Sequence, residues 1–271
     1  MTNRKDRSGH AFFRRTKGRH QVKLLLTMLS GIAGTVLVLL VLLLPSLVSA
    51  AQEGRGYVDL TAGTMSGDFG TPTTSRLFSL TPTLGYVDSR YDVSVSVPLL
   101  QISNSNGGST TTESGVGDVI LRGGMVLLPE GENGFSATGG LAVKLPTASE
   151  SKGLGTGETD YGAFLGLSRR FDTIKVSLSG GYIVVGDTAQ VTYDNVVLFS
   201  AGVAKLFSRT EAMLSFEGRS AAIPGAKNPR EIHAGVFHAL SQDYAVKASA
   251  FVGLNDGGPA NGFSVGMVRW F

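Results

Sequence analysis

Nine charged residues are the side chains most able to do chemistry in this sequence. Each belongs to a segment in which apolar and polar residues alternate, and by that alternation we place all nine on the polar face of a strand. Charges gathered on one face have two uses: a ring of them selects which solutes pass, and ion pairs among them stabilise the structure. Both uses stay open from the sequence. The nine are Asp92, Asp118, Arg122, Lys144, Arg170, Lys175, Glu217, Arg219 and Lys247.

One short turn predicts an ion pair between two of these charges. We expect residues 129–133 to form the turn and Leu128 to pair with Gly134 across it. In that register Asp118 lies directly opposite Lys144. Side chains directly opposite in an antiparallel pair are close enough for an ion pair.

A second short turn, at Asp172-Thr173, predicts a pair of like charges. The same reasoning places Arg170 opposite Lys175 on the polar face, near one mouth of the structure. If solutes pass along the polar face, two cations at its end slightly favour anionic or polar solutes. Because charges of both signs are interleaved along the chain, we predict neither cation nor anion selectivity.

Catalytic signals are weak. Residues 51–271 contain two histidines, His233 and His238, and their odd spacing puts them on opposite faces of a strand. A lipid-modifying enzyme needs a histidine and an acid in reach of a nucleophile or a water, and no HExxH motif is present. The acids Glu150, Glu158 and Asp160 are irregularly spaced, which indicates a solvated loop. We therefore predict no catalytic residue, no metal and no cofactor.

The elements that position the charges are short alternating segments. The sequence YDVSVSVPL from Tyr91 to Leu99 shows the pattern. A soluble two-sheet sandwich would also alternate, so strand number and link lengths must decide. We predict strands at 56–64, 75–87, 90–101, 116–128, 134–146, 159–171, 174–185, 192–207, 210–219, 230–240, 243–254 and 261–271.

The links between these strands alternate in length. Those after the even-numbered strands are short, and those after the odd-numbered strands are longer and rich in Gly, Ser, Thr and Asn, such as SNSNGGSTTTES from Ser103. An even strand number with short turns at one end and long loops at the other is typical of outer-membrane barrels. We predict one all-β domain over residues 51–271, a closed antiparallel transmembrane β-barrel of about 12 strands, with both chain ends in the periplasm.

Aromatic residues gather at the short-turn end of the predicted strands. A girdle of such rings meets the lipid headgroups in transmembrane barrels. Tyr161 and Tyr193 lie beside the long loops and could belong to the opposite girdle. Those at the short-turn end are Tyr86, Tyr91, Phe135, Phe171, Phe207, Tyr244 and Phe271.

Residues 1–50 have the pattern of a signal sequence. Residues 1–23 hold eight of the 24 basic residues and one of the 21 acidic residues, and the run from Leu24 to Val48 carries no charge. Small residues from Ser49 to Ala51 close the run. A basic region, an apolar region and a small-residue exit predict a secretory signal that is removed at this point. An uncleaved anchor helix is the alternative, because the apolar run is long enough to span a bilayer.

Removal of the signal reverses the net charge, because it leaves 16 basic residues against 20 acidic ones. The remaining Lys and Arg are scattered singly, so we predict no nucleic-acid partner. The partners that we expect are outer-membrane lipid and a small-molecule solute.

The last strand, NGFSVGMVRWF from Asn261, resembles the sorting signal of bacterial outer-membrane proteins. In that signal a terminal aromatic residue, here Phe271, closes an alternating strand that the barrel-assembly machinery recognises. Arg269 departs from the pattern, since an aromatic or apolar residue is usual at its position.

Four motifs, three of them rich in glycine, carry a narrower resemblance: GVGD at Gly115, KLPT at Lys144, GLGTGETDYG from Gly153 and GGY at Gly180. The stretch that holds them, from Gly115 to Tyr182, is similar to the outer-membrane transporter family named for the MetA pathway of phenol degradation. The likeness runs from about residue 115 to the C-terminus, while the first three strands share only the general pattern, and Ala148 replaces an expected glycine.

The resemblance implies passage of small, often aromatic, molecules through the outer membrane. Since the substrates of the family are largely inferred, the resemblance supports the architecture of this chain better than the identity of its substrate. We expect a passive channel or transporter of the bacterial outer membrane, and not an enzyme. The alternative is a non-conducting barrel with a structural or surface-binding role, whose loops are the binding part.

Overall fold

The computed structural model describes residues 54–68, 73–132 and 134–271. Within these ranges the regular structure is β-strand, apart from the single 3-10 turn η2 (Glu150–Lys152). No described helix has the length and apolar character needed to cross a bilayer. The signal sequence expected at residues 1–50 lies outside the described residues.

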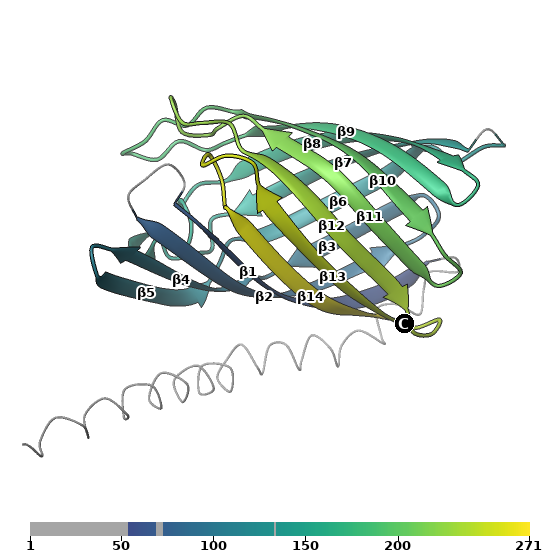
Figure 1. Cartoon of the computed structure of the whole chain (residues 1–271), viewed down its shortest axis with the longest axis horizontal. Coiled ribbons are helices and arrows are strands. Elements are labelled where there is room, and N and C mark those ends of the chain that lie inside the picture. Colours follow the sequence, from purple (N-terminus) through teal and green to yellow (C-terminus); the bar gives the residue numbers. More distant parts are fainter. Residues whose placement is uncertain (1–53, 69–72, 133) are drawn as a thin grey trace, which may run out of the picture. The chain divides into compact units, whose positions relative to one another are not determined.

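Twelve strands close into an antiparallel barrel, as the sequence predicts (Figure 1). The first strand pairs with the second on one side and with the last on the other, so the wall has no edge. Closure satisfies the backbone N–H and C=O groups that lipid cannot. The strands of the wall are β1 (Arg55–Gly67), β2 (Thr74–Val87), β3 (Tyr91–Ser96), β6 (Val119–Leu128), β7 (Phe135–Leu145), β8 (Asp160–Phe171), β9 (Ile174–Val184), β10 (Val196–Leu206), β11 (Thr210–Arg219), β12 (Arg230–Ala239), β13 (Tyr244–Gly253) and β14 (Asn261–Trp270).

A bend interrupts the predicted strands 90–101 and 116–128. The chain forms β3 and then β4 (Leu99–Asn106), returns as β5 (Ser109–Val116) and continues as β6. At the bend the Gly117 N–H donates a hydrogen bond of 2.7 Å to the Pro98 carbonyl oxygen. Proline has no amide hydrogen to donate to a sheet, which is why regular pairing stops there.

The segment expected to be a long loop is therefore a hairpin. β4 pairs with the far half of β2, while β5 pairs with β4 alone, and the hairpin projects beyond the wall (Figure 1). Gly107 and Gly108 form its turn with φ of 54° and 87°, which glycine adopts without strain. Thr and Ser are as common in turns as in exposed strands, and here hydroxyl pairs such as Ser103 with Thr112 (2.9 Å) support strand pairing.

The wall has an apolar outer face and a polar inner face. Large apolar side chains on the outer face are exposed, for example Leu141 (66%) and Leu165 (62%). This is the surface that lipid covers in a transmembrane barrel. On the inner face hydroxyl groups pair across neighbouring strands: Thr83 with Ser96, Ser136 with Ser168, Ser179 with Ser200, and Ser249 with Ser264.

Cations and aromatic rings share the short-turn end of the outer face. Arg169 lies 4.8 Å from the Phe171 ring centre, and Arg269 lies 5.6 Å from Tyr244 and 4.7 Å from Phe271. A lipid-facing cation costs ~2–4 kcal/mol at the bilayer midplane but only ~0–1 kcal/mol near the interface. The position of Arg269 at the end of its strand explains why the terminal sequence tolerates it.

Candidate functional site along the barrel lumen

The strand register places eight of the nine predicted charges on the lumenal side of the wall, and Asp118, which precedes β6, joins them through its contact with Lys144. They share that side with the hydroxyl pairs described above, because side chains on one face of a strand recur every second residue. The charges fall into separate groups at the loop end, in the middle and at the short-turn end of the lumen.

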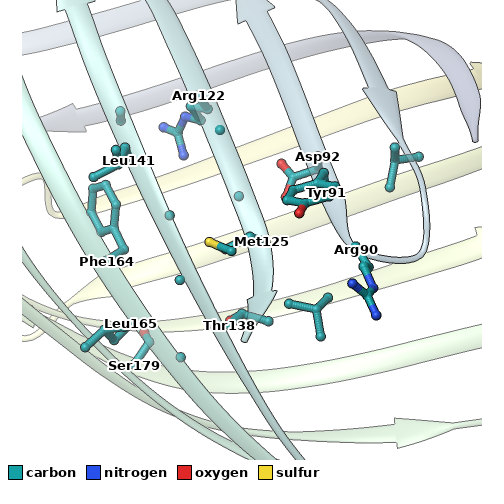
Figure 2. Close-up of a pocket in the computed structure, with 18 of the residues that line it drawn as sticks. Arg90, Tyr91, Asp92, Arg122, Met125, Thr138, Leu141, Phe164, Leu165 and Ser179 are labelled. Carbon is teal, nitrogen blue, oxygen red and sulfur yellow. The ribbon is translucent and has the colours of Figure 1, made fainter. Parts of the chain in front are cut away.

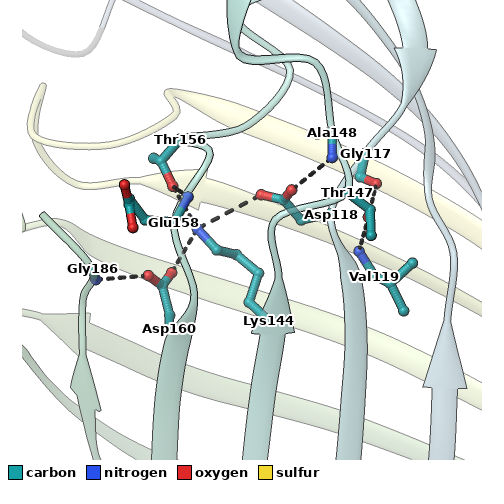
Figure 3. A network of polar contacts seen from close by, with 10 residues as sticks. All are labelled: Gly117, Asp118, Val119, Lys144, Thr147, Ala148, Thr156, Glu158, Asp160 and Gly186. Carbon is teal, nitrogen blue, oxygen red and sulfur yellow. Dashed lines mark hydrogen bonds and ion pairs between the residues drawn. The ribbon is translucent and has the colours of Figure 1, made fainter. Parts of the chain in front are cut away.

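Lys144 holds the first group together at the loop end (Figure 3). Its ammonium lies 2.8 Å from an Asp160 carboxylate oxygen and 3.7 Å from an Asp118 oxygen, and it donates to the Thr156 hydroxyl at 2.9 Å. The other Asp118 oxygen accepts the Ala148 N–H at 3.0 Å. Residues of the loop after β7 are thus fixed against the lumenal mouth by one lysine.

The predicted contact between Asp118 and Lys144 exists, but the register that predicted it is wrong. Leu128 pairs with Ala137, and an irregularity between Val126 and Leu128 shifts the alignment, so Lys144 lies opposite Ile120. The turn is longer than expected because Gly134 belongs to it, with φ of 66°. The stronger partner of Lys144 is Asp160, which the sequence argument had assigned to a solvated loop.

Lys247 forms an ion pair across the line where the barrel closes. Its ammonium contacts the Asp59 carboxylate, two strands away, across Gly266 of β14. A Cβ atom at Gly266 would lie 2.7 Å from the Lys247 Cε atom, so the glycine keeps this route clear. Asp59 was not among the lumenal charges predicted from the sequence. Its place at a polar position of an alternating strand was the available signal.

A cluster of charges lies near the loop end of β11 and β12. Glu231 is 6% exposed and lies directly opposite Glu217. His233 Nε2 lies 3.0 Å from Glu231 and 3.6 Å from Glu217, and Arg219 lies 3.4 Å from Glu231. Arg219 and the His233 ring therefore contact the buried Glu231 carboxylate, and these contacts give the group a structural role.

The same cluster bears on the enzyme alternative. Ser215 lies opposite His233, but its hydroxyl donates to the Glu217 carboxylate at 3.4 Å. The His233 ring stacks on Phe251 with 4.9 Å between ring centres. A nucleophile must share a hydrogen bond with its base, and this serine shares none with the histidine. Within the described ranges no three His, Cys, Asp or Glu side chains are placed to hold a metal ion.

At the short-turn end Arg170 lies opposite Lys175, as predicted. Arg170 is neutralised by Glu130 of the turn after β6, at 3.0 Å. In the described part of the chain Lys175 has no ion-pair partner. Of the two predicted cations, only Lys175 is therefore without an ion-pair partner in the described ranges.

A hollow of about 430 Å³ lies against β3, β6, β7 and β8, and its lining includes residues of the lumenal face (Figure 2). Asp92, Arg122 and Phe164 contribute the large lumenal side chains among its lining residues. Neither Asp92 nor Arg122 makes an ion pair in the described ranges. Phe164 was not among the site residues predicted from the sequence. Its ring stands at an inward position between Gly162 and Gly166.

The contacts inside the lumen follow the wall. Each lumenal ion pair in the described ranges joins elements that are neighbours or that are separated by one strand. The ring pair of Phe237 and Trp270 does the same, with 6.3 Å between centres. These residues coat the lumen, and none of these contacts ties one wall to the opposite wall.

Solved structures with this fold are outer-membrane barrels. The COG4313 outer membrane channel from Pseudomonas putida has a TM-score of 0.67 at 14% identity, over 83% of this chain and 98% of that chain. The NanC porin has a TM-score of 0.53 at 13% identity, over 78% and 98% of the two chains. The KdgM porin has a TM-score of 0.52 at 11% identity, over 79% and 99%. At these identities the likeness shows the fold, that of proteins that span the outer membrane.

The family comparison agrees with the motifs found in the sequence. No curated protein matches the chain. Residues 50–213 match the family model described as "Putative MetA-pathway of phenol degradation". The match includes the first strands, which we had expected to share only the general pattern, and it ends within β11. The chain belongs to this family of the MetA pathway of phenol degradation.

Proposed function

We propose that the protein is a passive channel of the bacterial outer membrane for small organic molecules, aromatic compounds among them. The observation that carries the proposal is the arrangement of the lumenal charges along the wall. A salt-bridge network that filled the lumen would join opposite walls, whereas each of these pairs joins elements that are close together along the wall, which supports an open axis. A polar lining of both signs favours small polar solutes over one ionic class.

Rings within the lumen support passage of aromatic solutes. By register five aromatic side chains face inward among serines, threonines and charges. A ring offers apolar contact and stacking to a flat solute, while the neighbouring hydroxyls keep the path wet. The rings are Tyr57, Phe164, Phe237, Phe251 and Trp270.

The proposal includes the route to the membrane. Residues 1–50 would direct export and be removed, and the strand that ends at Phe271 would be recognised by the barrel-assembly machinery. The two mouths would then have fixed sides, with short turns in the periplasm and long loops outside.

Reconstitution of residues 51–271 into planar bilayers tests the proposal. We expect discrete channel openings in potassium chloride. We also expect vesicles that contain the protein to swell faster in benzyl alcohol than vesicles without protein. A folded barrel that never opens would contradict a channel.

A surface-binding barrel is the second candidate, favoured by the β4–β5 hairpin with its unpaired edge. In that case the bilayers stay silent and binding of a surface partner is lost when residues 99–116 are replaced by a short turn. The same replacement would leave conductance present if the protein is a channel.

A further inference from the structure

We infer that the hollow beside β3, β6, β7 and β8 binds aromatic monocarboxylates of a single ring. The inference rests on the channel function proposed above and names a class of solute for it. Three features carry it: an unpaired guanidinium, a ring on a glycine bed and a carboxylate at the far side, all in one cavity of about 430 Å³ (Figure 2). Cavities of this size hold small organic ligands.

Arg122 supplies the positive charge. The other lumenal cations named above are neutralised by acids, except Lys175 at the short-turn mouth: Lys144, Arg170, Arg219 and Lys247 each have a carboxylate within 4 Å. Arg122 has none in the described ranges, and Ser94 and Ala142 are its uncharged neighbours across the strands. A guanidinium presents paired N–H donors that match the two oxygens of a carboxylate.

Phe164 supplies the surface for a ring. A Cβ atom at Gly181 would lie 2.5 Å from its Cδ1 atom and one at Gly162 would lie 2.8 Å from its Cζ atom, so the ring lies flat over these two glycines. Gly140 lies beside it on β7, and only backbone atoms come within 4 Å of a Cβ placed there. The floor next to the ring is therefore bare backbone that a flat solute can approach.

The spacing of the two groups fits one aromatic ring with one carboxylate. Arg122 pairs with Ala142, and Phe164 pairs with Gly140, so the two groups stand on either side of β7 and two residues apart along it. Strand spacings of ~4.8 Å and a rise of ~3.4 Å per residue put their Cα atoms about 12 Å apart. That spacing is wide enough for a benzoate-sized molecule to lie between the arginine and the phenylalanine.

Asp92 limits the charge of the ligand. Its carboxylate lies over Gly124, where a Cβ atom would come within 2.1 Å of Oδ1. No cation pairs with it in the described ranges. A second carboxylate on the ligand would meet this charge, so the hollow favours monocarboxylates over dicarboxylates.

Calorimetric titration of the refolded barrel in detergent tests the inference, with benzoate as the probe. Arg122→Gln should weaken benzoate binding by about tenfold or more, since a charged hydrogen-bond partner is lost. Lys205→Gln, the same charge change on the outer face, should leave it unchanged. Phe164→Leu should weaken benzoate about threefold but affect cyclohexanecarboxylate less than twofold. Phthalate should bind more weakly than benzoate.

Equal affinity of the wild type and Arg122→Gln for benzoate would overturn the inference, and so would equal affinity for benzoate and cyclohexanecarboxylate. If the arginine variant fails to fold, Gly140→Leu fills the floor without changing a charge and should abolish binding. Gly180→Leu, on the outer face of β9 and outside the lining of the hollow, should not. Benzoate binding by Gly140→Leu at the wild-type affinity would overturn the inference as well.

Conductance in potassium chloride, measured on the same samples, separates this inference from the proposed function. Openings without benzoate binding refute the site and leave the channel. Benzoate binding without openings refutes the channel and leaves the site.

Discussion

Replacement of Lys144 by methionine is the sharpest test of the loop-end network. The change keeps the length of the side chain but leaves the Asp118 and Asp160 carboxylates, 10% and 19% exposed, facing each other without their cation. Loss of one partner costs ~3–5 kcal/mol for a buried pair and ~0–1 kcal/mol for an exposed pair. At these exposures we expect a loss of about 2 kcal/mol in the free energy of unfolding.

Urea unfolding in detergent micelles, followed by the fluorescence of Trp270, the single tryptophan of the chain, measures this loss. Adding Asp160→Asn to Lys144→Met should restore about half of it, because the repulsion between the carboxylates is removed. Lys227→Met is the matched control. Lys227 pairs with Asp256 on the surface, with 67% and 44% of the two side chains exposed, and its loss should cost less than about 1 kcal/mol. The reasoning is refuted if both lysine variants lose the same stability or if the two changes at the network are additive.

Three further predictions follow from the turns and the closing strands. The Arg90 and Tyr91 N–H groups donate to the Asp88 carboxylate and lower the pKa of Asp88. The contribution of Asp88 to folding stability is therefore complete above its unfolded pKa of about 3.9, and it is lost as pH falls through the lower folded pKa. The stability gap between the wild type and Asp88→Ala should therefore narrow below about pH 4 in urea titrations. Gly266→Val should displace Lys247 and cost about 1–3 kcal/mol in the same assay, and a neutral result would contradict the proposed route of that side chain. Gly107→Val should make the β4–β5 hairpin more sensitive to proteolysis than Gly107→Asn, since asparagine tolerates positive φ and valine does not.

The barrel was predictable because its signals are periodic. A period of two fixes which face each residue takes, so the inward position of charges such as Arg122 and Lys175 follows from the sequence alone. Turn lengths are a weaker signal, as Gly134 shows: it joins the turn, and the register of β6 against β7 shifts with it. The β4–β5 hairpin was missed since Ser, Thr and Gly suit loops and exposed strands alike.

The partners of the lumenal charges were harder to predict than their faces. Asp160 reaches Lys144 from a neighbouring strand, and Glu130 reaches Arg170 from a turn, so both depend on the exact register. Phe164 was overlooked because an aromatic residue at an inward position breaks the apolar-outside rule. Its glycine neighbours marked the exception.

The contact between Lys247 and Asp59 joins residues 188 positions apart and lies over the seam between β14 and β1. Arg55 and Asp243 cross the same seam at its short-turn end, and the Phe271 N–H donates to the Gly56 carbonyl oxygen. All of these partners meet only after the whole polypeptide has been made. A nascent sheet that lacks its last hairpin has two unpaired strand edges, and Asp59 on one of them has no cation beside it. The opposite charges hold these two edges together once they meet, and edges of one chain meet more readily than edges of two chains because the polypeptide already links them.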